Sequence, residues 1–159
     1  MKLGLACVGR MKAGPERDIL ERYVGRIAAL RRMGLDGLDI REIDESREKA
    51  PDGRREREGA ELRALFPNDA VLVAFDERGR AVDSEAFARF VGETRDAGRK
   101  SLWFVIGGPD GLDAQMRTRA TAVFSFGAMT LPHQLVRIVA VEQIYRAMTI
   151  LLGHPYHRP

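Results

Sequence analysis

The chain has 159 residues and a net charge of +3, with 45% apolar and 31% charged residues. This length fits a single domain, residues 1–159, and the composition is that of an ordinary globular protein. No run of about 18 apolar residues occurs, which argues against a membrane span, and the short apolar N-terminus lacks a cleavage-site pattern. Cys7 is the only cysteine, which excludes an internal disulfide and a multi-cysteine zinc site. We expect a cytoplasmic protein whose small positive charge permits a polyanionic partner without requiring one.

Strand and helix patterns alternate along the chain. Short, nearly continuous apolar runs occupy residues 3–8, 70–75, 102–106 and 123–126. Such runs are typical of strands buried on both faces, as in a parallel sheet covered by helices. Residues 38–43 alternate between apolar and charged, which indicates a more exposed strand near an edge. The predicted fold class is α/β, with a parallel sheet and helices on both faces.

Two helices between these strands have recognisable ends. Pro15 predicts the start of the first helix, whose apolar stripe follows. That stripe is formed by Ile19, Tyr23, Ile27 and Leu30. Asp83 predicts the N-cap of another helix, which ends near Gly98 and turns Phe87, Phe90 and Val91 toward the sheet.

Residues 44–59 are strongly charged and contain Pro51-Asp52-Gly53, a sequence typical of a turn. We expect a solvated loop here, leading into a helix through Leu65 and Phe66. The sequence assigns this segment no role in function.

The last predicted helix begins at Pro132 and ends at Gly153. Apolar side chains cover most of its circumference: Leu135, Ile138, Val139, Val141, Ile144, Met148, Ile150, Leu151 and Leu152. A helix of this kind must be buried on more than one side. It is either a central core helix or a helix covered by a second copy of the chain. We expect a homodimer with this helix in the interface.

The most distinctive local motif is Ile106-Gly107-Gly108-Pro109-Asp110-Gly111, between a strand and a helix that starts near Asp113. Glycines at such a point let the backbone turn and let a ligand approach closely. The spacing matches neither a dinucleotide fingerprint nor a P-loop. The alternative is a tight turn without a ligand. If a ligand binds, a bulky side chain at Gly108 should abolish binding and leave the fold intact.

Two further segments follow strands, at residues 75–79 and 125–133. Parallel-sheet proteins bind ligands at the carboxyl ends of their strands, where these segments and the glycine motif would meet. Small residues beside Met129 and Leu131 suit a pocket for a flat, mostly apolar ligand held by main-chain hydrogen bonds.

Polar groups interrupt the last helix and fill the C-terminal tail. Glu142 and Arg146 are four residues apart and can pair along the helix. Such charges either form a structural ion pair or face a site. The tail carries His154, Tyr156, His157 and Arg158. A metal site or packing is possible there, but aromatic rings that stack on bases and an arginine that holds phosphate would suit RNA recognition.

These motifs together closely resemble the ribosomal RNA large subunit methyltransferase H family, over essentially the full length. The segments that carry the resemblance are Met1-Lys2-Leu3, residues 106–111, Thr130-Leu131-Pro132-His133, Arg137, Glu142-Gln143, Tyr145-Arg146 and residues 154–158. The resemblance implies the knotted SPOUT methyltransferase fold, with a trefoil knot at the C-terminus. It also implies a homodimer that uses S-adenosyl-L-methionine (AdoMet), without a metal, to methylate N3 of a pseudouridine in a stem-loop of 23S rRNA on the ribosome.

The resemblance also assigns roles to residues. The cofactor site would comprise Phe75, Gly107, Gly108, Phe126, Gly127, Ala128, Met129, Thr130, Leu131 and Pro132. The catalytic group would comprise Arg137, Arg146, Tyr156 and His157, and His133, His154 and Arg158 would bind RNA. The N3–H group must lose its proton, which His157, Tyr156 or a water could accept while an arginine stabilises the anion.

Two other classes of protein stay open. A non-catalytic ribosome-binding module would keep the basic tail without needing the glycine motif. A doubly wound nucleotide-binding regulator would need phosphate donors that this sequence lacks.

Overall fold

The computed structural model describes residues 1–31 and 34–158, in which strands and helices alternate as expected. The strands are β1 (Lys2–Val8), β2 (Leu38–Ile43), β3 (Val71–Ala81), β4 (Ser101–Ile106) and β5 (Ala122–Ser125). The helices are α1 (Pro15–Ala29), α2 (Pro51–Leu65), α3 (Ser84–Asp96), α4 (Ala114–Arg119) and α5 (His133–Leu151). The five strands form one parallel sheet in the order β2-β1-β4-β3-β5. The predicted parallel sheet, with residues 38–43 at an edge, is confirmed.

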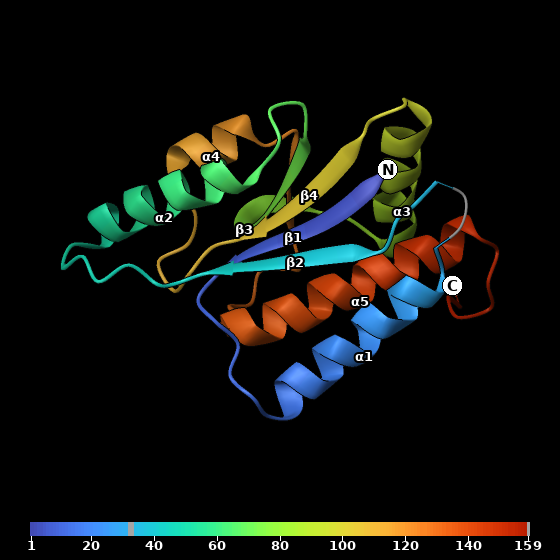
Figure 1. Cartoon of the computed structure of the whole chain (residues 1–159), viewed down its shortest axis with the longest axis horizontal. Helices are drawn as coiled ribbons and strands as arrows, with labels where there is room; N and C mark the ends of the chain where they lie inside the picture. Colours follow the sequence, from blue (N-terminus) through green and yellow to red (C-terminus); the bar gives the residue numbers. More distant parts are fainter. Residues whose placement is uncertain (32–33, 159) are drawn as a thin grey trace.

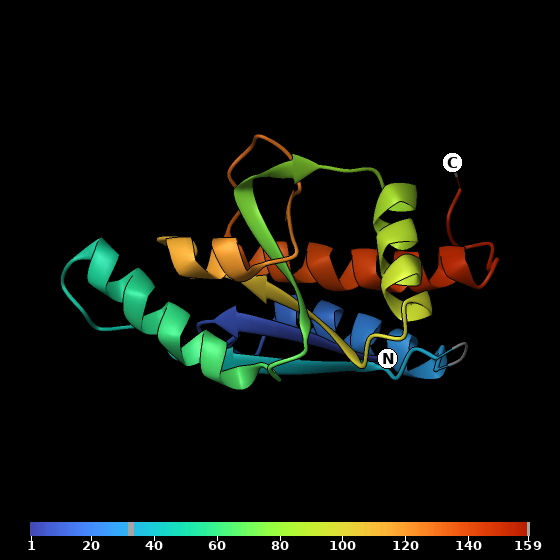
Figure 2. The same cartoon turned by 90° about the horizontal axis from the view of Figure 1, so that it is seen from above.

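Helices cover both faces of the sheet. Figures 1 and 2 show α1 and α5 running together on one side of it, with α2 and α4 on the other. Successive β1 residues point to opposite faces, so Leu5 joins the cluster under α1, α3 and α5, while Ala6 joins the one under α2 and α4. This double burial explains the unbroken apolar runs.

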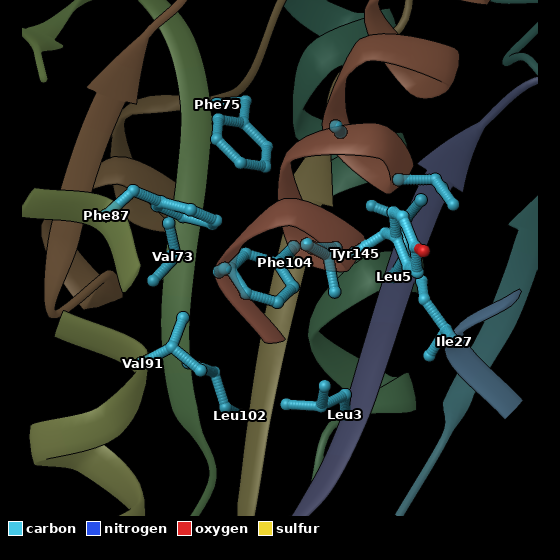
Figure 3. Close-up of a cluster of buried hydrophobic side chains, with 14 of the residues drawn as sticks. Leu3, Leu5, Ile27, Val73, Phe75, Phe87, Val91, Leu102, Phe104 and Tyr145 are labelled. Carbon is cyan, nitrogen blue, oxygen red and sulfur yellow. The ribbon is translucent and has the colours of Figure 1, made fainter. Parts of the chain in front are cut away.

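Aromatic rings fill the larger core cluster beside α3. Figure 3 shows Phe75, Phe87 and Phe104 together, with Phe87 approaching from α3. The ring centroids of Phe75 and Phe104 are 5.8 Å apart, and those of Phe87 and Phe104 are 5.7 Å apart. Burying each ring contributes about 1.5–3 kcal/mol. Phe75 is the last buried residue of β3, so this packing anchors the sheet edge where the predicted ligand loops begin.

The predicted starts of α1 and α3 are confirmed, with one error in the apolar stripe of α1. Pro15 starts α1, and the Asp83 carboxylate accepts a hydrogen bond from the Ala86 backbone N–H at 2.6 Å as the N-cap of α3. Ile19, expected in the buried stripe, is 37% exposed, and Leu20 is buried instead. In the first turns of α1, the buried face is therefore shifted by one residue from the predicted stripe.

The prediction of a loop over residues 44–59 is wrong in its second half, because α2 already begins at Pro51. Proline suits the first helical turn, where no intrahelical partner for its nitrogen is needed, and Asp52 there complements the helix dipole. The helix buries Leu62 and is followed by the buried Phe66, and both pack on the sheet. Its stability comes from this tertiary packing, since the segment has little amphipathic pattern of its own.

The strand that was expected to end at Phe75 continues to Ala81. Its pairing with β5 is irregular, since Phe75 and Arg80 both lie opposite Phe124. Residues 76–79 form the irregular stretch between them, and the backbone of Gly79 passes so close to Phe124 that a Cβ would lie 2.5 Å from its carbonyl carbon. The predicted loop is therefore a bulge within the strand.

Helix α5 lies between α1 and α3 on one face of the sheet (Figure 1). These neighbours within the chain account for the burial of Val141, Ile144 and Met148. Leu135 remains 43% exposed, and Ile138 and Val139 are half-buried. Dimerisation through α5 stays a prediction. Within the part of the chain that the structure describes, no helix is long and apolar enough to cross a membrane.

Candidate functional site

A pocket of about 470 Å³ lies at the carboxyl end of the sheet, within the size range of small-molecule sites. The bulge of β3 and the segments that follow β4 and β5 meet there. The expected cofactor residues that line it are Phe75, Gly107, Gly108, Phe126, Gly127, Met129, Thr130 and Leu131. Ala128 and Pro132 belong to the same loop but do not line the pocket, and His133, expected to bind RNA, does line it.

One half of the pocket is apolar. Phe75 and Phe126 stack with their ring centroids 4.5 Å apart, and Leu131 and Val136 continue this wall. The start of α5 thus contributes directly to the pocket. A flat aromatic group fits a surface of this kind, with the loop backbone available for hydrogen bonds.

The glycines of residues 106–111 are required by packing inside the protein. A Cβ on Gly107 would lie 2.6 Å from the carbonyl carbon of Gly111, and Gly108 and Gly111 form a β-bridge. A Cβ on Gly108 would lie 3.0 Å from Val8 Cγ1 and 3.2 Å from Glu58 Oε2. These contacts argue against the expectation that a bulky residue at Gly108 leaves the fold intact, because its side chain would point toward Val8 and Glu58 beneath the loop.

Helix α2 holds the glycine loop through Arg54. Arg54 donates to both carboxylate oxygens of Asp110, through Nε at 2.6 Å and Nη2 at 3.1 Å. Its Nη1 donates to the carbonyls of Glu48 and Lys49 at 3.0 and 2.9 Å. Arg54 keeps the pKa of the Asp110 carboxyl below its usual value. The charged segment that looked like a solvated loop therefore braces the predicted cofactor loop.

Glu58, one turn after Arg54, lies beneath the same loop and is 4% exposed. Its Oε1 accepts a hydrogen bond from the Ser46 backbone at 2.8 Å, whereas its buried Oε2 has no partner among the described residues. Burial raises the pKa of this carboxyl, because desolvation disfavours the charged form. Sequence reasoning missed Glu58, since nothing local distinguishes it from the exposed glutamates around it.

The other half of the pocket is charged. Asp76 follows Phe75 on β3, so its side chain points to the opposite face of the sheet, toward α4. Its Oδ2 lies 3.6 Å from Arg117 Nη1, and both residues line the pocket. Arg117 was not anticipated from the sequence, because only the fold brings it to Asp76.

Arg137, expected among the catalytic residues, does not line the pocket. It is 1% exposed, and Nη1 donates to Glu42 at 2.9 Å while Nη2 donates to the carbonyl of Val8. Glu42 also accepts from the backbone N–H of Met11 at 3.0 Å. Arg137 thus joins the start of α5 to the ends of β1 and β2.

The other expected catalytic residues form a cluster beside the middle and second half of α5. Glu142 Oε1 accepts from Arg146 Nη2 at 2.6 Å and from the Tyr156 hydroxyl at 2.9 Å. The Tyr156 hydroxyl is also 3.3 Å from that of Tyr23, and Arg146 Nη1 is 3.3 Å from His157 Nδ1. The predicted pair of Glu142 and Arg146 is confirmed. Burial is the main cause that raises the pKa of Tyr156, followed by its hydrogen bonds with Tyr23 and with Glu142, which accepts from it.

This tail cluster, comprising Glu142, Arg146, Tyr156 and His157, lies away from the pocket in the same chain. Helix α5 runs from the pocket, beside the ends of β1 and β2, to the end of the sheet where the N-terminus lies (Figure 1). His154 and Arg158, also expected to bind RNA, are exposed in the tail. The structure therefore separates the expected residues into two groups, one around the start of α5 and one where the tail folds back onto the middle and second half of this helix.

Comparison with known proteins gives a consistent result. A family model described as "Predicted SPOUT methyltransferase" matches residues 1–157. A protein of Methylobacterium radiotolerans is 56% identical over 99% of this chain and 98% of its own length. Proteins of Beijerinckia indica and Rhizobium meliloti are 52% and 50% identical, each over 99% of both chains. All three relatives are named ribosomal RNA large subunit methyltransferase H.

Proposed function

The chain belongs to the SPOUT methyltransferases, within the ribosomal RNA large subunit methyltransferase H family, and we propose that it methylates N3 of a pseudouridine in 23S rRNA on the assembled ribosome. AdoMet as the methyl donor and the C-terminal trefoil knot come with membership of the SPOUT class. The knot is a departure from the general rule that chains do not thread their own loops. The methylated atom, the ribosome as substrate and the residue roles are our proposal.

The observation that carries the proposal is the convergence of the β3 bulge and of the two loops after β4 and β5 on one pocket. The pocket has an apolar half, at Phe75, Phe126 and Leu131, and a charged half at Asp76 and Arg117. AdoMet has the same division, with an aromatic base at one end and a charged amino acid at the other. The volume of about 470 Å³ and the accessible loop backbone suit such a ligand.

AdoMet supplies an electrophilic methyl group on its sulfonium centre. The task of the protein is to place the nucleotide in line with it and to manage the N3 proton. We propose that Arg146 stabilises the developing anion and that His157 accepts the proton. Tyr156 is better suited to donate a hydrogen bond, because its raised pKa keeps the hydroxyl protonated. His133, His154 and Arg158 would contact the RNA.

The separation of the two groups of residues supports a homodimer. On α5, Arg146 follows the pocket-lining His133 by 13 residues and Val136 by 10 residues, which corresponds to about 15–20 Å along the helix. Over such a distance, the tail cluster would not contact the reacting atom of a nucleotide bound at the pocket of the same chain. A second copy could place its tail over the pocket, with the exposed Leu135 on α5 inside the interface.

Radiolabelled methyl transfer tests the reaction. The protein should label ribosomes that lack the modification, label free 23S rRNA poorly, and leave the methyl group on N3 of one pseudouridine. A non-catalytic ribosome-binding module would bind ribosomes without transferring label and without binding AdoMet in calorimetry. That result would refute the proposal.

Complementation tests the shared site. One variant lacks residues 156–159, and the other carries Leu131→Asp in the apolar half of the pocket. Each should be inactive alone. An equal mixture should recover about one quarter of wild-type activity, because half of the dimers are mixed and each mixed dimer has one intact site. If mixing restores nothing, the tail does not act across the interface.

A further inference from the structure

We propose that Asp76 and Arg117 bind the amino-acid end of the methyl donor, Asp76 at its ammonium group and Arg117 at its carboxylate. This inference rests on the proposed function and deepens it, because it assigns the charged half of the pocket to one part of AdoMet. Neither residue was singled out for such a role by its sequence pattern.

Asp76 is held in place but keeps an open hydrogen-bonding position. Its side chain is 7% exposed, and Oδ1 accepts a hydrogen bond from the Arg78 backbone at 3.0 Å. That bond fixes the carboxylate within the bulge of β3. Oδ2 accepts no hydrogen bond among the described residues, and the distance of 3.6 Å to Arg117 Nη1 is too long for one. A largely buried carboxylate with one unused oxygen favours a cationic donor.

Arg117 also keeps unused hydrogen-bond donors. Its side chain is 25% exposed, and its one hydrogen bond within the described chain runs from Nη1 to the carbonyl of Leu112. Nε and Nη2 remain available. A guanidinium fixed by one bond and open along its other edge is suited to a carboxylate.

The other charged groups of the pocket are less suitable. Several are already satisfied by partners within the protein, namely Asp110 by Arg54, Asp113 by Arg63 and Arg55 by Asp52. Glu56, Glu77 and Arg78 are exposed at the rim, where solvent screens them. Among the described charged residues that line the pocket, Asp76 and Arg117 differ from the others. They have opposite charges, they lie close together, and each keeps an unused hydrogen-bonding position.

The geometry matches an α-amino acid. Its ammonium and carboxylate are attached to the same carbon, so they need an acceptor and a donor side by side, as Asp76 and Arg117 are. Insertion of the zwitterion would replace one loose ion pair by two charge-assisted hydrogen bonds. Since Phe75 and Asp76 are consecutive and point to opposite faces, the base and the amino acid would lie on either side of the β3 edge.

Isothermal titration calorimetry tests the inference with AdoMet and with 5′-methylthioadenosine, which keeps the base and ribose but lacks the amino acid. Asp76→Asn and Arg117→Met should each weaken AdoMet binding about tenfold or more. Both should leave methylthioadenosine affinity within about twofold, since neither is proposed to touch the base or ribose. Asparagine keeps an acceptor for the Arg78 backbone, so the bulge should persist. Glu77→Gln, an exposed neighbour on the same rim, is the control and should change neither affinity.

Decarboxylated AdoMet assigns the two groups separately. Its affinity should still fall in Asp76→Asn but should not change in Arg117→Met. Unchanged AdoMet affinity in both variants, or equal losses for AdoMet and methylthioadenosine, would overturn the inference while the proposed function stands. A wild-type protein that binds no AdoMet would overturn the proposed function itself.

Discussion

Substituting Arg137 by methionine separates a structural role from a catalytic one. Methionine has a similar length and fits an apolar site, but it cannot donate to Glu42 or to the carbonyl of Val8. Removing one partner of a buried ion pair costs about 3–5 kcal/mol, because the other is left without compensation. Glu42 is 23% exposed and keeps its bond from Met11, so we expect the lower end of this range, about 3 kcal/mol.

Urea unfolding monitored by circular dichroism measures this loss. In a thermal scan it corresponds to a decrease of roughly 6–12 °C in Tm for a chain of this size. A double-mutant cycle with Glu42→Gln should show coupling between the two residues. Arg10→Met is the matched control: Arg10 pairs with Asp44 at 2.6 Å, but the two side chains are 67% and 74% exposed. Its unfolding midpoint should not change measurably, since solvent screens such pairs.

The result that would refute this reasoning is an Arg137→Met protein as stable as the Arg10→Met protein. If that stable protein had also lost methyl transfer, Arg137 would act on the substrate, as the sequence first suggested. Loss of stability, with methyl transfer retained well below the unfolding temperature, would establish the structural role.

Three further predictions concern the interior. Gly108→Ala should destabilise the protein by about 1–3 kcal/mol in urea unfolding, because its Cβ meets Val8 and Glu58, whereas Gly25→Ala in the open part of α1 should not destabilise it. Burial raises the pKa of Glu58, so the folded state holds this proton to higher pH than the unfolded chain, and stability is lost as pH rises above the ordinary value of 4.5. Glu58→Gln should therefore gain stability over wild type at about pH 8 and lose this advantage near about pH 4, where both states are protonated; an equal difference at both pH values would contradict it. Burial also raises the pKa of Cys7 to about 12, so a thiol reagent at pH 8 should modify it only after urea unfolding, and rapid modification of the native protein would contradict its burial.

The strands and the ligand-binding edge could be predicted because their signals are local. An unbroken apolar run needs burial on both faces, and glycines after a strand permit a tight turn, whatever the rest of the chain does. The two expected strand-end loops at residues 106–111 and 125–133 therefore meet at the pocket as predicted. The third segment, after Phe75, reaches the pocket as a bulge, because Gly79 allows β3 to resume its pairing with β5.

The parts that the sequence did not predict depend on partners far along the chain. Whether a charge on an apolar helix faces a site or a buried partner is not a local property, and Glu42 is 95 positions from Arg137. The start of α2 was missed because its apolar contacts come late, at Leu62 and Phe66, after a stretch whose charges look solvated. Arg117 and Asp76 likewise become neighbours only when α4 packs beside β3.

The charged segment before and within α2 is thus explained by the pocket it supports. Arg54 spans 56 positions to reach Asp110 and uses its remaining donors on the carbonyls of Glu48 and Lys49. Glu58 connects the same helix to Ser46 and lies against Gly108. The loop before α2, the helix itself and the glycine loop are therefore linked by bonds that all pass through α2. A cofactor site made mainly of backbone needs such a brace, because glycines that allow close approach also leave the loop free to move. Arg54, Arg55 and Glu58 suit that task, since charged side chains can bond to polar groups of a loop that apolar side chains could only cover.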